Sequence, residues 1–238
     1  MKATALEFRL RFWIHVVIYV IGFTAPWDRW LHLDSIRTWQ LLASWPARNR
    51  WLSFNGATIA VLVVGIVLAL AGAVLRTWGS AYLGTSIVRA GAMRGDAMVA
   101  AGPYRRVRNP LYLGTFLHTL ALALLMPPSG AIFTVVLVGA FQLRLILAEE
   151  DFLLAKLGER YREYRARVPR LVPAMSARVL DAGVRPAWGI AFLSEVYVWG
   201  AFVSFAALGW RYNSMLILQG VLVSLGLSLV ARGFLPQR

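Results

Sequence analysis

The 238-residue sequence contains no cysteine, and this absence excludes disulfides, thiolate nucleophiles and cysteine-ligated zinc or iron–sulfur centres. Histidine is almost as scarce, and no two of the three residues His15, His32 and His118 have the spacing of metal ligands. Acidic residues are also few, with 11 Asp and Glu against 25 Lys and Arg. We therefore expect no metal site and no hydrolytic metal chemistry, in a chain with a formal net charge of +14.

Charged residues make up 15% of the sequence and hydrophobic residues 59%, whereas soluble domains average about a quarter and about a half. This much positive charge in a soluble protein would favour a nucleic-acid partner. Here the basic residues lie between apolar runs that are too long for a soluble core, and the run 57–75 has no charged residue. The composition therefore predicts an integral membrane protein whose partner is the lipid bilayer and not nucleic acid.

A transmembrane helix needs about 20 mostly apolar residues, and six segments approach or meet that length. The Pro127-Pro128-Ser129-Gly130 link between the third and fourth is so short that these two must form an antiparallel helical hairpin. The sequence thus predicts an all-α, polytopic membrane protein with about six transmembrane helices, over Phe12–Trp30, Ala57–Leu75, Leu111–Met126, Ala131–Ala148, Ala187–Trp210 and Ser214–Ala231.

The distribution of basic residues predicts the orientation of these spans. With both termini on one side, 19 of the 25 Lys and Arg lie on that side, five lie opposite, and Arg144 lies inside a span. By the positive-inside rule, the basic side with both termini is cytoplasmic. The stretch Trp27–Phe54 on the opposite side holds half of the ten tryptophans, which predicts a segment at the membrane interface.

Most of the candidate chemistry lies in two cytoplasmic segments, of which the first is Arg76–Pro110. Gly102-Pro103 predicts a turn, and Asn109-Pro110 begins the third span with proline at the first helical position. We expect the side-chain oxygen of Asn109 to cap this helix. The positive end of the helix dipole would suit an anionic group such as a carboxylate. A basic turn at the membrane surface is the alternative interpretation of the same residues.

The second segment is Arg144–Pro173, where a cytoplasmic amphipathic helix continuing from Glu149 is expected. The Glu149 carboxylate points along its apolar stripe and needs a partner. Arg144 would be a structural partner and a bound cation a functional one, and both remain open. For Glu195 inside the fifth span, a structural ion pair is favoured over catalysis. The apolar stripe consists of Leu153, Leu157, Tyr161, Tyr164 and Val168.

An ordered set of residues joins the two segments: Gly102-Pro103-Tyr104, Arg108-Asn109-Pro110, Tyr112, Gly114, Glu149-Glu150, Leu153, Gly158, Tyr161, Tyr164 and Val168-Pro169. This set resembles the isoprenylcysteine carboxyl methyltransferase family of integral-membrane enzymes, with its phospholipid methyltransferase relatives. The family has Arg-His-Pro where this chain has Asn109, so no imidazole can titrate at that position. The resemblance divides the chain into N-terminal spans (1–75), a methyltransferase core (76–173) and two C-terminal spans (174–238).

The resemblance implies S-adenosyl-L-methionine bound at the cytoplasmic membrane face and methyl transfer to a lipidic or prenylated acceptor. A glutamate of the pair Glu149-Glu150 would receive the cofactor's ammonium, and Arg76 or Arg144 would act catalytically by orienting an anionic acceptor. Because neither membrane histidine is expected near the site to act as a base, an already ionised carboxylate is the favoured acceptor. The implied cofactor-binding residues are Tyr104, Arg108, Asn109, Pro110, Tyr112, Gly114, Glu149 and Glu150.

Two other functions are compatible with the sequence. A sterol- or enone-type membrane reductase would share a similar motif before the hairpin and use NADPH, but the two adjacent glutamates argue against it. A non-catalytic membrane scaffold with a degenerate site is favoured by Asn109 and disfavoured by the otherwise intact motifs. The sequence leaves the identity of the acceptor and the oligomeric state open.

Overall fold

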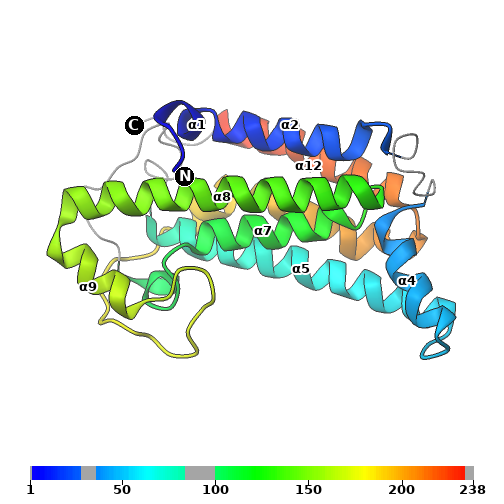
Figure 1. Cartoon of the computed structure of the whole chain (residues 1–238), viewed down its shortest axis with the longest axis horizontal. Helices are drawn as coiled ribbons and strands as arrows, with labels where there is room; N and C mark the ends of the chain where they lie inside the picture. Colours follow the sequence, from blue (N-terminus) through cyan, green and yellow to red (C-terminus); the bar gives the residue numbers. More distant parts are fainter. Residues whose placement is uncertain (1, 28–35, 84–99, 234–238) are drawn as a thin grey trace.

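The computed structural model describes residues 2–27, 36–83 and 100–233, and within these ranges the chain is helical with no β-strand (Figure 1). The long helices run along the long axis of the molecule. The elements are α1 (Ala5–Arg9), α2 (Arg11–Thr24), α4 (Thr38–Arg48), α5 (Phe54–Leu83), the 3₁₀ helix η1 (Gly102–Arg105), α7 (Pro110–Ala123), α8 (Pro128–Leu157), α9 (Glu159–Arg167), α10 (Trp188–Ser194), α11 (Val196–Val203), the π-helical η2 (Ser204–Leu208), the 3₁₀ helix η3 (Gly209–Arg211) and α12 (Ser214–Gly233).

Three helices, α5, α8 and α12, are long and apolar enough to cross a membrane. The predicted fifth span is broken: α10 and the segment Val196–Arg211 pass the same test only together, bent by 68° at Glu195. The predicted first and third spans correspond to α2 and α7, which are apolar helices of 14 residues each. The protein is thus an all-helical integral membrane protein in which three to four of the six expected spans have transmembrane length and composition.

Helices α5 and α8 continue well beyond the apolar runs that predicted them. Each has 30 residues, or about 45 Å at 1.5 Å per residue, whereas the bilayer core is about 30 Å thick. The extra turns carry Arg76 on α5 and Glu149 and Glu150 on α8. The site residues are therefore held on rigid extensions of membrane helices.

The hairpin turn lies three residues earlier in the chain than predicted. Helix α7 ends at Ala123, the turn covers residues 124–127, and Pro128 already begins α8. Proline suits this first helical position because its missing N–H would have no partner there. The short connection still makes α7 and α8 antiparallel neighbours (Figure 1).

Glycines bring α5 and α7 into close contact. A Cβ atom added at Gly114 would lie 2.9 Å from the Gly72 carbonyl oxygen and 2.7 Å from Cγ of Arg76. A Cβ added at Gly72 would in turn lie 2.8 Å from the Gly114 carbonyl oxygen. Small residues allow this backbone approach, as is common between membrane helices. Gly114 therefore positions the two helices that carry Arg76 and the cofactor motif.

The Gly114→Ala variant should lower the stability of the protein by about 1–3 kcal/mol, because the added methyl group forces two backbones apart. Gly226→Ala is a matched control, since a Cβ at that α12 position meets nothing within 4 Å. It should be neutral or slightly stabilising, because alanine has the higher helix propensity. Thermal unfolding in detergent measures both, and equal melting temperatures would contradict the close contact.

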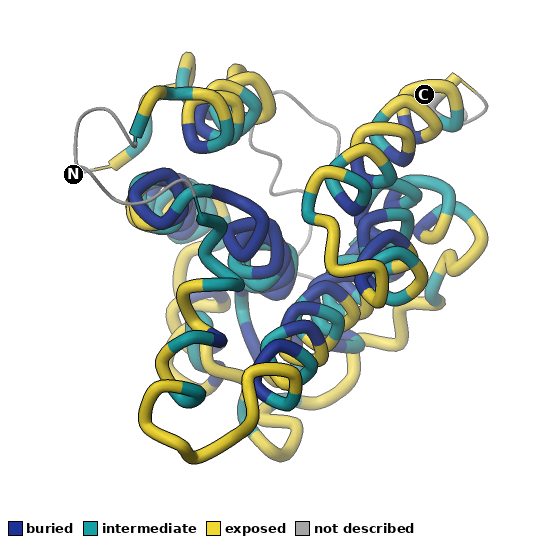
Figure 2. Tube along the Cα trace, turned by 90° about the vertical axis from the view of Figure 1, so that its right-hand side faces the viewer, coloured by how far each residue is buried: buried dark blue, intermediate teal, exposed yellow. Residues whose placement is uncertain are grey.

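Helices α2 and α12 stand apart at the same face of the molecule. Helix α2 packs on α8, whereas α12 packs on α11 and η2. Figure 2 shows the helix that follows the N-terminus and the helix that ends at the C-terminus on opposite sides of this face. Side chains from both helices line the large cavity described below.

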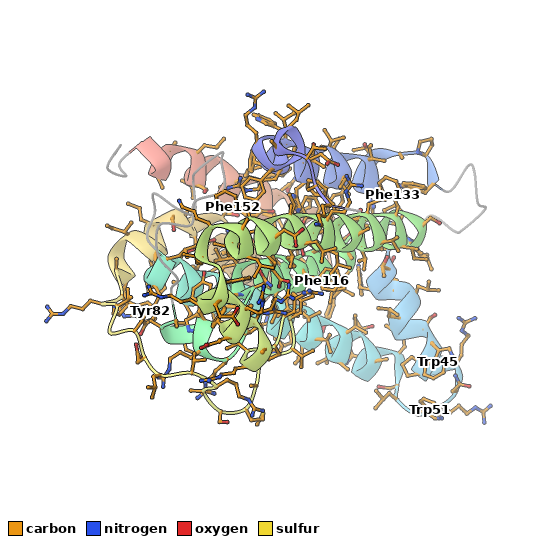
Figure 3. All side chains as sticks on the ribbon, turned by 60° about the vertical axis from the view of Figure 1, so that its left-hand side comes forward. Trp45, Trp51, Tyr82, Phe116, Phe133 and Phe152 are labelled. Carbon is orange, nitrogen blue, oxygen red and sulfur yellow. The ribbon has the colours of Figure 1, made fainter. Side chains whose placement is uncertain are left out.

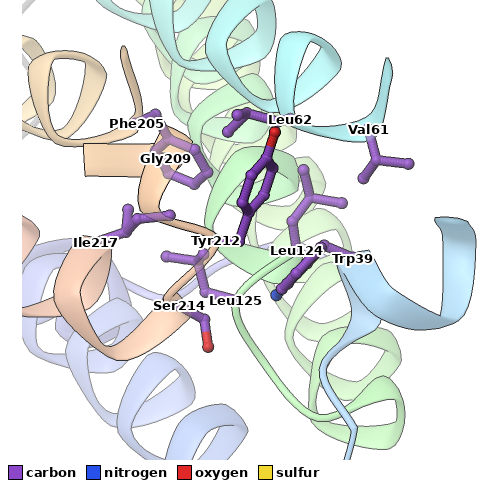
Figure 4. Close-up of a pocket in the computed structure, with 10 residues that line it drawn as sticks. All are labelled: Trp39, Val61, Leu62, Leu124, Leu125, Phe205, Gly209, Tyr212, Ser214 and Ile217. Carbon is purple, nitrogen blue, oxygen red and sulfur yellow. The ribbon is translucent and has the colours of Figure 1, made fainter. Parts of the chain in front are cut away.

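The end of the molecule that holds α4 carries exposed tryptophans. At the end with α4, Trp45 and Trp51 are exposed and form an edge-to-face pair with ring centroids 4.7 Å apart (Figure 3). Such tryptophans are typical of a membrane–water interface, as predicted for this segment. Nearby, ten mostly apolar residues enclose a small cavity of about 20 Å³, where Trp39 of α4 packs near Leu124 and Tyr212 (Figure 4). That volume holds about one water molecule and offers no ligand site.

Candidate active site

A large cavity of about 890 Å³ runs between the helices. Its lining comes from α1, α2, α5, η1, α7, α8, α9, α11 and α12, together with Ser194 and Glu195 at the break after α10. This volume lies near the upper end of the range for small-molecule sites, about 300–1,000 Å³. The predicted cofactor residues at its wall are Tyr104, Arg108, Asn109, Pro110, Tyr112, Glu149 and Glu150.

The segment before α7 is fastened by the chain that follows α9. The Nε of Arg105 donates to the Val179 carbonyl at 3.0 Å, and Nη1 of Arg106 donates to the Met175 carbonyl at 2.9 Å. These two arginines therefore hold a loop, as the interpretation of a basic turn would have it. Arg108 differs from them, because its side chain is only 8% exposed and lines the cavity.

Glu150 is the centre of a buried polar cluster. Arg170 donates to it from Nη2 at 2.9 Å and from Nε at 3.1 Å, and the Arg108 Nη1 atom lies 3.4 Å from Oε1. The Asn109 amide donates to the same Oε1 at 3.4 Å. The hydrogen bonds to Glu150 raise the pKa of Arg170, which stays charged. With the Glu150 side chain 3% exposed and two guanidinium groups beside it, its charge is already balanced within the protein.

Arg108 keeps unused donor capacity inside the cavity. Its Nε and Nη1 atoms are buried and have no hydrogen-bond partner among the residues that the structure describes. The 3.4 Å approach of Nη1 to Glu150 is a charge contact without hydrogen-bond geometry. Buried donors without partners are costly, so this guanidinium has the chemistry of an anion site.

Asn109 does not cap α7 through its side chain as predicted. The N-cap position makes no side-chain hydrogen bond, because the amide is turned toward Glu150 and donates to the Arg170 carbonyl at 3.2 Å. The Asn109 backbone carbonyl still accepts from Leu113 at 3.0 Å. The first N–H groups of α7 therefore have no side-chain cap and attract negative charge beside the cavity.

Glu149 has a different environment from its neighbour. Its Oε2 atom accepts one hydrogen bond, from the Tyr112 hydroxyl at 3.0 Å, and the side chain lines the cavity. Within the described part of the chain, no guanidinium or ammonium group makes a salt bridge with it. Of the two partners considered from the sequence, Arg144 is not the one found. A half-buried carboxylate without a salt bridge has the chemistry of a cation site, although the positive charge of Arg11 acts on it from a longer distance.

Three tyrosines enclose the same end of the cavity. Burial raises the pKa of Tyr104, Tyr161 and Tyr164, so all three keep their protons at neutral pH. The Tyr164 hydroxyl donates to the Tyr104 carbonyl at 2.8 Å and thereby joins α9 to η1. The rings of Tyr161 and Tyr164 also pack against Leu153 and Leu157 of the predicted stripe. The helix itself breaks at Gly158, whose φ of 60° begins a new direction in α9.

An ion pair lies deeper in the cavity. Arg76 donates from Nε and Nη2 to the two oxygens of Glu195, at 2.7 and 3.0 Å, and from Nη1 to Thr115 at 2.6 Å. Ser80 donates a further bond to Glu195 at 2.7 Å. Glu195 thus has the structural partner that was favoured from the sequence. The Arg76 charge, expected to orient an anionic acceptor, is balanced by it.

Two predicted site residues lie outside the cavity. Gly114 packs against α5 as described above. Arg144 binds Glu7 from Nη2, at 2.8 and 2.9 Å to the two oxygens, and fastens α1 to α8. The structure therefore brings Arg76, but not Arg144, to the lining.

The structure adds residues that the sequence reasoning placed away from the site. His15 and His118 both line the cavity, and each has one buried ring nitrogen without a partner among the described residues. The same is true of the Gln142 amide nitrogen and the Ser228 hydroxyl. Only the four-residue spacing of Arg11, His15 and Tyr19 on one helix face could have signalled a shared wall.

Comparison with known proteins identifies the core of the chain. Residues 60–160 match the family model described as phospholipid methyltransferase. The nickel-cobalt-cadmium resistance protein NccN of Alcaligenes xylosoxydans xylosoxydans is 23% identical over 164 residues, which cover 66% of this chain and 72% of that protein. The cobalt-zinc-cadmium resistance protein CzcN of Cupriavidus metallidurans is 24% identical over 166 residues, which cover 65% of this chain and 71% of that protein.

No solved structure matches the chain. The matched residues include α7, the hairpin and the Glu149-Glu150 pair, which are the elements that carried the resemblance in the sequence. Residues 60–160 are therefore similar to the phospholipid methyltransferase family, the integral-membrane methyltransferases related to the isoprenylcysteine carboxyl methyltransferases.

Proposed function

We propose that this protein transfers a methyl group from S-adenosyl-L-methionine to a lipid-soluble acceptor inside the cavity. The observation that carries the proposal is that every predicted cofactor residue except Gly114 lines one cavity, which continues between α2 and α12. The family match at residues 60–160 supports methyl transfer as the reaction class.

The charged groups at the Glu149 end fit the amino-acid part of the cofactor. Glu149 makes no salt bridge among the described residues and suits the ammonium group. Arg108 suits the carboxylate with its two unpartnered buried donors, and the N–H groups at the start of α7 add to this attraction. Glu150 is already balanced by Arg108 and Arg170, so we assign it to holding these arginines in place.

The bound cofactor would supply an electrophilic methyl group on a positively charged sulfur. The work left to the protein is to hold the acceptor in line with that methyl group and to exclude water. The Tyr104, Tyr161 and Tyr164 rings and the apolar stripe close the cavity on the α9 side. These residues therefore contribute positioning and shielding rather than proton transfer.

The proposed acceptor reaches the site from the bilayer. Between the cofactor end and the face shared by α2 and α12, the lining is mainly apolar, with Val16, Val20 and Phe23 on one helix and Leu222 and Leu225 on the other. A lipidic tail buried there would contribute about 25 cal/mol for each Å² removed from water. This supports a lipidic or prenylated acceptor and does not by itself define the methylated atom.

A carboxylate acceptor was expected because no base was predicted near the site. Both membrane histidines line the cavity, so this argument for a carboxylate no longer holds. The two alternative functions gain no support from the fold or the comparisons. A scaffold with a degenerate site would not need the intact charged groups around Glu149 and Arg108. No observation favours a nicotinamide cofactor.

A transfer assay tests the proposal. The purified protein, reconstituted in vesicles of lipids from its expression host, should move tritium from methyl-labelled donor into the organic phase. Arg108→Gln should reduce the affinity for the donor by about ten- to a hundredfold, the loss of a charged hydrogen bond. Arg106→Gln is the matched control, because the Arg106 side chain binds the loop carbonyl of Met175 and is not among the residues that line the cavity. No transfer by folded protein with any extracted lipid fraction, or equal effects of the two variants, would count against this function.

A further inference from the structure

We propose that the acceptor presents a phenolic hydroxyl on an apolar body, and that Nε2 of His15 accepts the proton of this hydroxyl during methyl transfer. The inference deepens the proposed function and rests on it for the methyl donor. It is carried by the tautomer of His15, by the charge balance of the deep cavity, and by polar atoms there that have no partner.

The hydrogen bonding of His15 defines which ring nitrogen can act as a base. Its Nδ1 lies 2.6 Å from the backbone carbonyl oxygen of Arg11, one turn earlier on α2. A carbonyl oxygen can only accept, so Nδ1 carries the hydrogen and Nε2 has a free lone pair. Nε2 is buried, and none of the described residues donates to it. The neutral imidazole therefore offers a proton acceptor to the cavity.

The level of His15 along α2 suits the reacting group of an acceptor. Arg11, His15 and Tyr19 succeed one another at four-residue spacing, which separates them by about 6 Å each. At one end, Tyr112 of α7 binds Glu149. At the other, the Tyr19 hydroxyl lies 2.6 Å from the Thr119 hydroxyl, two turns deeper on α7. His15 thus lies between the proposed cofactor end and the apolar chamber.

The charge of the chamber does not suit an anionic acceptor. Beyond the level of Arg11, the charged side chains at the lining are Arg76 and Glu195, which neutralise each other in a two-pronged ion pair. A carboxylate head group would lose its hydration and gain no net counter-charge. An uncharged head group has no such cost. The described charged and titratable side chains that share the cavity with His15 are Arg9, Arg11, Tyr19, Arg76, Tyr104, Arg108, Tyr112, His118, Glu149, Glu150, Tyr161, Tyr164, Glu195 and Tyr197.

The unpartnered polar atoms favour an oxygen that both donates and accepts. Gln142 lines the same cavity and is 4% exposed, and its amide nitrogen has no acceptor among the described residues. The preceding residue in the chain, Phe141, has its ring centroid 5.3 Å from that of His15. A hydroxyl can donate to His15 Nε2 and accept from such an amide, whereas a thiol does both weakly. A phenol is also acidic enough for an imidazole base, and an aliphatic alcohol is not.

The proposed step is balanced. The phenolic oxygen forms a bond to the methyl carbon while the carbon–sulfur bond breaks, and that electron pair remains on sulfur as a neutral thioether. The phenolic proton passes to His15 Nε2, which becomes an imidazolium and later releases the proton. His118 also has an unpartnered ring nitrogen, Nδ1, while its Nε2 lies 3.1 Å from the Tyr197 hydroxyl, so the test below compares variants of both histidines.

The test uses a probe and needs no turnover. A 4-nitrophenol with a long alkyl chain is added to the full-length protein in lipid nanodiscs without methyl donor, and the visible absorbance of its anion is measured against empty nanodiscs. Wild type should increase the anion fraction, and His15→Asn should remove at least about nine-tenths of the increase, since the asparagine amide can replace the Nδ1 bond but not Nε2. His118→Gln should retain the increase. His15→Gln is the second variant, and tryptophan fluorescence confirms folding of each.

Two results would overturn the proposal. One is an anion fraction in both folded His15 variants equal to that in wild type. The other is stronger binding of an alkyl benzoate than of an alkyl phenol with the same tail. In the methyl-transfer assay, His15→Asn should lower kcat by about 10²–10⁴-fold without weakening the binding of S-adenosylhomocysteine. Failure of wild type to bind S-adenosylhomocysteine would refute the proposed function, whereas the probe reports on His15 independently.

Discussion

Replacing Glu149 by glutamine is expected to lower the affinity for S-adenosylhomocysteine on the order of a hundredfold. Among the described carboxylates at the cavity, Glu149 is the one without a salt bridge, and the substitution removes with it the proposed partner of the ligand's ammonium group. Truncating one partner of a buried charge pair costs about 2–5 kcal/mol. Folding should be retained, because Glu149 makes no salt bridge in the described part of the chain and a glutamine oxygen can still accept the Tyr112 hydrogen bond.

Calorimetric titration of the detergent-purified variant measures this effect. Glu163→Gln is the matched control, since Glu163 lies exposed on α9 away from the cavity lining and should leave the affinity unchanged. A Glu149→Gln variant that binds as tightly as wild type would remove Glu149 from the cofactor site.

Replacing Glu150 by glutamine is expected to act on stability, with a loss of about 3–5 kcal/mol. Glu150 is the shared counter-charge of Arg108 and Arg170, and its side chain is 3% exposed. Without the carboxylate, the Arg108 guanidinium stays buried with no opposite charge beside it. The two adjacent glutamates thus have separable roles, one in ligand binding and one in holding the arginines.

Intrinsic tryptophan fluorescence follows the unfolding, because the chain has ten tryptophans and no cysteine for thiol-reactive dyes. The melting temperature of Glu150→Gln should fall by several degrees, while that of Glu163→Gln should stay within the error. The melting temperature of Arg170→Gln should also fall, but by less, since the charge of Arg108 remains beside Glu150. A Glu150→Gln protein that melts like wild type would show that the cluster is not needed for the fold.

Much of the fold could be predicted because hydropathy is local. The uncharged run in α5 and the apolar runs in α8 and α12 identify their helices, and the short link after α7 defines the hairpin. Glu195 marked the interruption of the fifth span. Helix ends were less predictable. Helices α5 and α8 continue past their apolar runs into the site, and hydropathy identifies only the apolar part of a helix.

The candidate site was predictable where its residues lie in one short motif, and less so where partners come from distant helices. Glu149 and Glu150 both line the cavity, and the sequence does not say which of them is paired with arginine. Likewise, the Asn109 side chain could cap α7 or bond to a carboxylate distant in the sequence, and in the structure it donates to Glu150. The contribution of His15 requires α2 to pack beside α8, where His15 meets Phe141 across 126 positions of sequence, and no local pattern encodes this contact.

The most direct test of the central claim is calorimetric titration of the folded, detergent-purified protein with S-adenosylhomocysteine, with NADPH titrated in parallel. The account predicts micromolar binding of S-adenosylhomocysteine and no binding of NADPH. Binding of NADPH alone, or of neither ligand by folded protein, would contradict it.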